Sequence, residues 1–116
     1  MNCYYSDLNG DLVELGNFTQ EQAIALLRMH GESNATKALY IGASRNDTDF
    51  VEIGYEGDGR FMVHTDRLVK PAGFWKKFFA KHHIDIQVSG LPHAEDVLIS
   101  YFNDSRECFE NRLSES

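Results

Sequence analysis

His93 and Glu95 have the His-x-Glu spacing of zinc deaminases, where a histidine and two cysteines hold the metal and the glutamate moves protons. The chain has two cysteines, Cys3 and Cys108, at its opposite ends, and no Pro-Cys-x-x-Cys motif follows the histidine. The metal would therefore lack its thiolate ligands. Glu95 is better explained as an acid in the first turn of a helix, where it interacts favourably with the helix dipole.

Other groups that could bind an ion are incomplete. His82 and His83 are adjacent, so on a helix they would point about 100° apart and would not bind one ion together without further ligands. Asp47 and Asp49 could supply two oxygens, but calcium takes about six to eight, and the EF-hand spacing is absent. We therefore expect the chain to need no metal ion and no organic cofactor.

The Gly-x-Gly triplet at residues 57–59 differs from a phosphate-binding loop. It does not continue as Gly-x-Gly-x-x-Gly, and the neighbouring carboxylates of Glu56 and Asp58 would repel a phosphate. The chain also lacks the Gly-x-Ser-x-Gly motif of serine hydrolases, and neither cysteine carries the local signature of a thiol enzyme. We therefore expect a protein that is not an enzyme.

Length and charge restrict the class of protein. The 116 residues suffice for one domain, and 42% hydrophobic and 25% charged residues are ordinary for a globular chain. The net charge is −7, with acids in excess over residues 1–59 and 85–116 and bases in excess over residues 60–84. Because phosphate binding depends on cation density, we expect no direct binding of nucleic acid by the chain as a whole.

The N-terminus has no positively charged start with an apolar run after it, and the chain has no apolar stretch of about 18 residues. We therefore expect a cytoplasmic location, without a signal peptide, a membrane span or a membrane partner. In the reducing cytosol, Cys3 and Cys108 are expected to be free thiols. We expect a monomer or a weak homodimer.

The first third of the chain predicts a hairpin and a helix. An Asn-Gly pair suits the turn of a hairpin over residues 4–15. Thr19 and Gln22 match a capping box, so a helix is predicted over residues 20–30, with Gly31 as its left-handed C-cap. The face of this helix that should pack on the sheet comprises Ala23, Leu26, Leu27 and His30.

Residues 37–43 predict a buried strand, and residues 49–55 and 60–66 predict a second hairpin. In its first strand, apolar residues alternate with Glu52 and Glu56, which places these carboxylates on the face away from the core. The turn of this hairpin is therefore exposed and acidic. The sheet positions expected in the core are Leu39, Ile41, Val51, Ile53, Phe61 and Val63.

The rest of the chain predicts more helices and another strand. Residues 72–83 predict a helix with lysines on one side and four aromatic residues on the other, and residues 84–88 predict a strand. Pro92 suits the first turn of a further helix, and Ser105 could cap a last short one. The chain is thus predicted to be a single α+β domain over residues 1–116, with a mostly antiparallel sheet and two or three helices packed on it.

Two interpretations of the basic segment over residues 60–84 stay open. Aromatic residues interleaved with lysines can hold single-stranded nucleic acid by base stacking, which would make the chain a small ligand- or nucleic-acid-binding accessory domain. Four aromatic residues on one helical face are also what a helix buries against a core. Those residues are Phe74, Trp75, Phe78 and Phe79.

This short acidic chain combines four predicted elements in a fixed order. They are the first hairpin, the capped helix "TQEQAIALLRMHG", the apolar strand "ALYIGAS" and the hairpin "DFVEIGYEGDGRFMVH". In this, the protein resembles the small immunity proteins of bacterial polymorphic toxin and contact-dependent growth inhibition systems. The resemblance covers residues 8–66 in element order and glycine placement, and "GFWKKFFAKHH" and the last helix lie outside it. It implies a cytoplasmic inhibitor without catalytic residues, whose partner is the C-terminal domain of a cognate toxin, often a nuclease or deaminase.

An acidic surface would suit such a partner. Toxins that act on nucleic acid carry cationic clefts, and an acidic protein can mimic phosphate and be steered toward them. We expect the contact to include carboxylates and a tyrosine as an aromatic anchor, namely Asp47, Asp49, Glu52, Glu56 and Asp58 with Tyr40 or Tyr55. The alternative is that the acidic turn is only a solvated loop of a domain whose site lies elsewhere.

Overall fold

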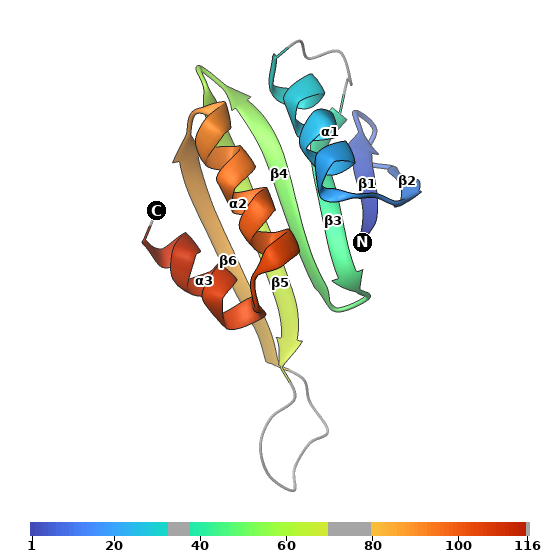
Figure 1. Cartoon of the computed structure of the whole chain (residues 1–116). Coiled ribbons are helices and arrows are strands. Elements are labelled where there is room, and N and C mark those ends of the chain that lie inside the picture. Colours follow the sequence, from blue (N-terminus) through green and yellow to red (C-terminus); the bar gives the residue numbers. More distant parts are fainter. Residues whose placement is uncertain (33–37, 70–79, 116) are drawn as a thin grey trace, which may run out of the picture.

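The computed structural model describes residues 1–32, 38–69 and 80–115. Within them, six strands and three helices follow one another as β1 (Asn2–Asp7), β2 (Leu12–Asn17), α1 (Gln20–Glu32), β3 (Ala38–Asn46), β4 (Asp49–Gly57), β5 (Arg60–Val69), β6 (Ala80–Ser89), α2 (Leu91–Asn103) and α3 (Arg106–Ser114). The strands form one antiparallel sheet in the order β2-β1-β3-β4-β5-β6 (Figure 1). This confirms the predicted α+β fold.

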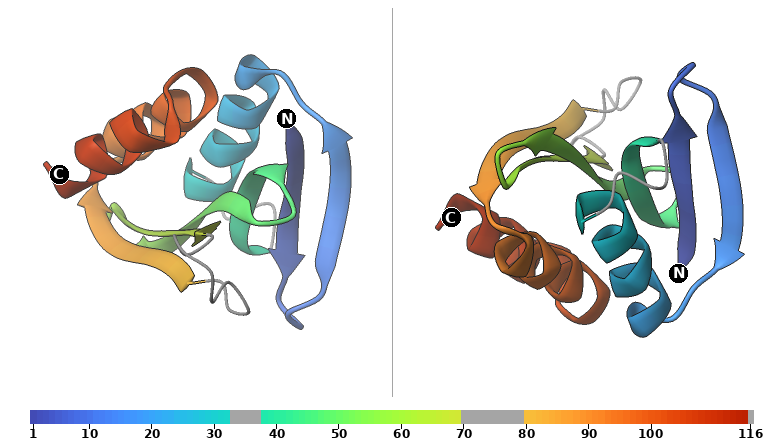
Figure 2. Two further views of the ribbon diagram at one scale, coloured as in Figure 1. Left: turned by 90° about the horizontal axis from the view of Figure 1, so that it is seen from below. Right: turned by 90° about the horizontal axis from the view of Figure 1, so that it is seen from above.

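All three helices lie on the same face of the sheet. Figure 2 shows the sheet as a curved layer, with α1, α2 and α3 on its concave side. No described element covers the opposite, convex side. The molecule therefore has two layers, and one whole face of the sheet is available for side chains that do not serve the core.

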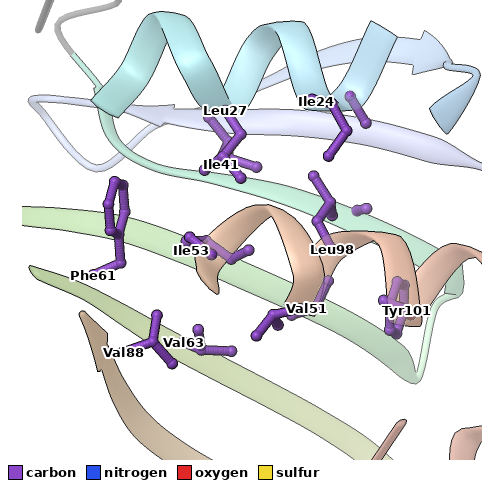
Figure 3. Packing of buried hydrophobic residues seen from close by; sticks show 14 of the residues in the cluster. Ile24, Leu27, Ile41, Val51, Ile53, Phe61, Val63, Val88, Leu98 and Tyr101 are labelled. Atoms are coloured by element: carbon purple, nitrogen blue, oxygen red, sulfur yellow. The ribbon is translucent and has the colours of Figure 1, made fainter. Parts of the chain in front are cut away.

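The core lies between the helices and the concave face of the sheet. Figure 3 shows Leu27 of α1 and Leu98 of α2 meeting strand residues such as Ile53. Five of the six strand positions predicted for the core are buried, and the exception is Leu39, which is 49% exposed. Leu39 lies next to the first residue of β3, at the end of the strand. Of the predicted face of α1, Leu26 is only partly buried.

The start of α1 was predicted correctly and its end was not. The capping box forms, because the Thr19 N–H donates to Gln22 Oε1 at 2.9 Å and the Gln22 N–H donates to Thr19 Oγ1 at 3.2 Å. The helix then continues through Gly31, which is helical and not a left-handed cap. A Cβ at this position would lie 2.8 Å from the Phe61 ring, so the glycine serves the close approach of α1 to β5.

We expect Gly31→Val to lower the free energy of unfolding by about 1–3 kcal/mol, because the added side chain must displace the buried ring of Phe61. Ala25→Val is the matched control, since Ala25 is exposed on the same helix and should cost less than about 0.7 kcal/mol through helix propensity. Urea unfolding measures both. Equal losses in the two variants would show that Gly31 is not needed for packing.

The helix predicted over residues 72–83 is wrong where the structure describes it. Residues 80–83 are the first residues of β6, with Lys81 opposite Leu68 and His83 opposite Asp66 of β5. The ladder with β5 holds ten residue pairs, and pairing of this length outweighs a local helical pattern. The four aromatic residues of the predicted helix lie at positions 74–79, outside the described residues.

The C-terminal helices begin where the sequence predicts, but the prediction for Glu95 is wrong: the first turn of α2 holds no acidic residue, and Glu95 lies beyond it and pairs with Arg28 of α1. Pro92 lies in the first turn of α2, and the buried residues of this helix include Leu98 and Tyr101. Ser105 caps α3, since its hydroxyl oxygen accepts a hydrogen bond from the Cys108 N–H at 3.2 Å. Together the two helices cover β4, β5 and β6, which leaves their outward-facing side chains on the convex side.

Candidate functional site

The convex face of the sheet carries a continuous row of polar and aromatic residues. Residues paired across neighbouring strands share a face, and side chains two residues apart along a strand do so as well. The register of the strand pairs therefore places one row across all six strands, consisting of Glu14, Tyr4, Gly42, Glu52, His64 and Asp85. We call the surface formed by this row and its neighbouring rows the open face.

Tyr4 and Glu52 form the centre of the open face. The Tyr4 hydroxyl donates a hydrogen bond to Glu52 Oε2 at 2.8 Å, although the two residues lie on strands that are not adjacent. The ring reaches across β3 over Gly42, where a Cβ would lie 2.4 Å from the ring atoms. Gly42 is thus the residue that permits the contact between Tyr4 and Glu52.

The Glu52 carboxylate is half-buried, and no arginine or lysine among the described residues forms an ion pair with it. Burial raises the pKa of Glu52, and the Tyr4 hydrogen bond and the nearby His64 only partly oppose this increase. Three other half-buried carboxylates have an arginine within 3.0 Å, namely Asp49, Glu110 and Asp104. Among the described residues, no arginine or lysine is paired with Glu52.

Two hollows in the open face meet at Glu52. The first has a volume of about 420 Å³ and is lined by Tyr4, Phe50 and Glu14, among others. The second has a volume of about 340 Å³ and is also lined by Tyr40 of β3 and Met62 of β5. Gly54 forms part of the second hollow, and a Cβ there would lie 2.8 Å from the Leu39 carbonyl oxygen. Because Gly42 and Gly54 have no side chains, the surface beside Glu52 is recessed.

His64 lies between two carboxylates on the same face. Its Nδ1 is 2.7 Å from Asp85 Oδ1, and its Nε2 is 3.6 Å from Asp66 Oδ2. Its ring centroid is 5.8 Å from that of Phe50, so the histidine also contacts the aromatic part of the site. These contacts hold the imidazole in place beside Glu52.

Chemistry at the open face is limited to acid, base and binding groups. Within the described ranges, no three side chains of His, Cys, Asp or Glu are placed to hold a metal ion. Cys3 borders the first hollow, but burial raises the pKa of its thiol to about 11, so the thiol is protonated at neutral pH. The arrangement suits recognition of a partner more than nucleophilic catalysis.

Two residues predicted for the partner contact lie on the opposite, helix-covered side. Asp49 Oδ1 accepts hydrogen bonds from Arg106 at 2.9 Å and from the Tyr101 hydroxyl at 2.8 Å. The backbone N–H of Tyr55 donates to His30 Nε2 at 2.9 Å, and its ring lies 5.1 Å from that of Phe61. Both residues lie an even number of positions from the buried Val51 and Ile53 on the same strand, so their side chains point to the same, helix-covered face.

The structure brings three of the other predicted residues together and separates two. Tyr40, Glu52 and Glu56 line the second hollow. Asp47 lies in the turn before β4 and borders the first hollow, whereas Asp58 lies in the turn after β4. The Asp58 side chain is 90% exposed and lies 3.7 Å from Arg60. The acidic residues therefore follow the length of β4 and are not confined to one tip.

Sequence reasoning missed half of this surface. Alternation had placed Glu52 and Glu56 outward, which the structure confirms. Alternation within one strand does not show which residues of other strands lie beside Glu52 and Glu56. That depends on the pairing of β1 with β3 and of β5 with β6, which the local sequence of one strand does not determine. The residues missed were Tyr4, Glu14, Phe50, His64 and Asp85. The alternating pattern of each strand was the signal that could have selected them.

Comparisons of the chain with family models, with curated proteins and with solved structures found no match. In the described part of the chain, no helix combines the length and the apolar character needed to cross a membrane.

Proposed function

We propose that this chain is an immunity-type inhibitor that binds and neutralises the C-terminal domain of a cognate bacterial toxin through the open face. The toxin domain is a nuclease or deaminase with a cationic cleft. The observation that carries the proposal is a whole sheet face, free of described helices, on which aromatic residues and carboxylates are exposed together. A sheet face that packs only against the core would be apolar, and one that serves only solubility would be polar, so neither would combine aromatic residues with carboxylates.

The composition of the open face supports a protein partner. Protein interfaces have an apolar, aromatic centre and a polar rim, and tyrosine is enriched in them. Here Tyr4, Tyr40 and Phe50 lie near the centre, and Leu12, which is 59% exposed, extends the apolar area toward the edge strand β2. Protein binding would cover these groups, which otherwise contact water.

The charge of the open face supports a basic partner. Among its described side chains, one arginine, Arg60, accompanies the carboxylates of Glu14, Glu52, Glu56, Asp66 and Asp85. Such a field repels nucleic acid and attracts a cationic cleft, which raises the rate of association. Blocking the cleft would prevent the toxin from reaching its substrate.

We expect the double variant Glu56→Lys, Asp58→Lys to slow association with the toxin domain encoded beside this chain by at least about tenfold at low salt. The free energy of unfolding should change by less than about 0.5 kcal/mol, because both side chains are exposed. Stopped-flow binding at several salt concentrations and growth rescue measure the effect. Glu107→Lys, an exposed reversal on α3, is the matched control.

Two outcomes would contradict the proposal at different levels. If the chain neither binds the toxin domain nor rescues growth, it is not the inhibitor proposed. If it does both, but the double variant matches Glu107→Lys at every salt concentration, the turn between β4 and β5 lies outside the contact.

A further inference from the structure

Only one of the two Glu52 carboxylate oxygens has a hydrogen-bond donor among the described residues. Oε2 accepts the hydrogen bond of Tyr4, and no donor among the described residues reaches Oε1. The Glu52 side chain extends from the middle of β4 and borders both hollows. A ligand that donates hydrogen bonds and carries positive charge would bind Oε1 and neutralise the charge of this carboxylate.

Among the described residues, Glu52 has no arginine or lysine beside it, unlike three other half-buried carboxylates. Arg106 pairs with Asp49 and Glu110, and Arg112 pairs with Asp104, all within 3.0 Å. A half-buried carboxylate without such a partner loses hydration without compensation. Tyr4 replaces only part of that hydration, since it donates one hydrogen bond. The chain keeps Glu52 in a position that reduces stability, which is typical of a residue that serves binding.

The first hollow has the shape and lining for a flat cation. Its volume of about 420 Å³ falls in the range of sites for small ligands, so one long side chain fits into it. Tyr4 and Phe50 present aromatic rings beside the carboxylate, and Glu14 adds a further negative charge. A guanidinium group can stack its plane on aromatic rings while its N–H groups bind a carboxylate, whereas a lysine ammonium group is a compact point charge without a plane that could stack.

We propose that the first hollow binds an arginine side chain of the protein partner, with Glu52 accepting hydrogen bonds from its guanidinium group. Phe50 and Tyr4 contact the plane of the guanidinium, and Gly42 keeps Tyr4 in the position that orients Glu52. This inference rests on the proposed function, since it names the residue type with which the toxin domain enters the open face. The arginine is the anchor of the interface, and the other carboxylates guide its approach.

The test titrates the isotope-labelled full chain with N-acetylarginine amide and follows backbone amide signals by NMR. The affinity of a single residue is expected on the order of millimolar. Signals of residues 4, 42 and 52 should shift together. Glu52→Gln should weaken binding at least about tenfold, because it removes the charge of the acceptor and keeps its shape. Glu107→Gln, on α3, should leave the affinity unchanged.

Two further probes separate the chemistry of the ligand. N-acetyllysine amide should bind more weakly than the arginine probe, and N-acetylcitrulline amide, which has the same shape without the charge, should cause no shift at these residues. The inference is overturned if Glu52→Gln and the parent chain bind the arginine probe equally, or if the shifts occur away from residues 4, 42 and 52.

The result is independent of the test of the proposed function. Probe binding that requires Glu52 supports the arginine site even where growth rescue by the chain fails. Conversely, the parent chain could bind the toxin and rescue growth while the arginine probe causes no shift that depends on Glu52. That result would support the inhibitor function and contradict the arginine site.

Discussion

Arg106→Ala is expected to lower the free energy of unfolding by about 3–5 kcal/mol, the range for removing one partner from a buried ion pair. Arg106 is only 7% exposed. Its NH1 group donates to Asp49 Oδ1 and to Thr65 Oγ1, each at 2.9 Å, and its Nε donates to Glu110 Oε1 at 3.0 Å. One guanidinium thus joins α3 to β4 and β5.

The loss would be large because the groups around Arg106 cannot regain water easily. Without the guanidinium, Asp49 keeps the Tyr101 hydroxyl and a distant Arg45 at 4.0 Å, and Glu110 loses its ion pair with Arg106. The Arg106 guanidinium also lies 5.4 Å from the centre of the Phe109 ring, so its removal opens space beside a fully buried aromatic residue. Burial of unpaired charge and lost packing both favour unfolding.

Arg112→Ala is the matched control within the same helix. Arg112 also pairs with a carboxylate, Asp104, at 3.0 Å, but its side chain is 68% exposed. Exposed ion pairs contribute at most about 1 kcal/mol, so this variant should unfold almost as the parent does. Urea unfolding followed by circular dichroism compares the two. Equal losses would show that α3 is not attached through Arg106.

Local sequence signals predicted most of the fold because each acts over a few residues. Thr19 with Gln22, Pro92 and Ser105 marked the starts of the three helices, and their side chains or ring geometry act within one turn. Alternation predicted the direction of Val51 and the other residues of the β4–β5 hairpin. These features needed no knowledge of distant segments.

The wrong predictions concern positions that distant segments decide. Gly31 looked like a helix end, but the Phe61 ring from β5 needs the space of its missing Cβ. Residues 80–83 looked helical, but ten backbone pairs with β5 make them strand. Asp49 looked like a surface carboxylate until Arg106, which follows it by 57 residues, was placed beside it. Each error reflects a tertiary contact that overrides a local preference.

The candidate site was half predictable for the same reason. Glu52, Glu56 and Tyr40 were identified from their own strands. Tyr4 became part of the site only through its hydrogen bond to Glu52, across 48 residues of sequence. The sequence predicts an acidic surface centred on the exposed turn at Asp58, whereas the register of β3, β4 and β5 places its centre in the middle of the sheet.

Glu52 also gives a reason to expect that function and stability can be separated. Burial raises the pKa of Glu52, so the folded state binds its proton more tightly than the unfolded state does. The contribution of Glu52 to stability therefore becomes less favourable as the pH rises through this raised pKa, and it is unfavourable at neutral pH. Glu52→Gln keeps an acceptor for Tyr4 and removes that cost, so we expect it to unfold at neutral pH with a free energy equal to or above that of the parent.

Glu52→Lys is expected to weaken the complex with the toxin domain by about 2–5 kcal/mol, the range for breaking a buried, hydrogen-bonded charge pair at an interface. The lysine would place positive charge in the first hollow and repel the cationic group that Glu52 is proposed to accept. The loss should appear mainly as faster dissociation, because the exposed carboxylates that guide approach are unchanged. Biosensor kinetics measure it, with Glu52→Gln as the variant that keeps the fold and Glu107→Lys as the control for net charge. If Glu52→Lys dissociates no faster than Glu107→Lys, the middle of the open face is not the interface, and the contact must lie elsewhere on the molecule.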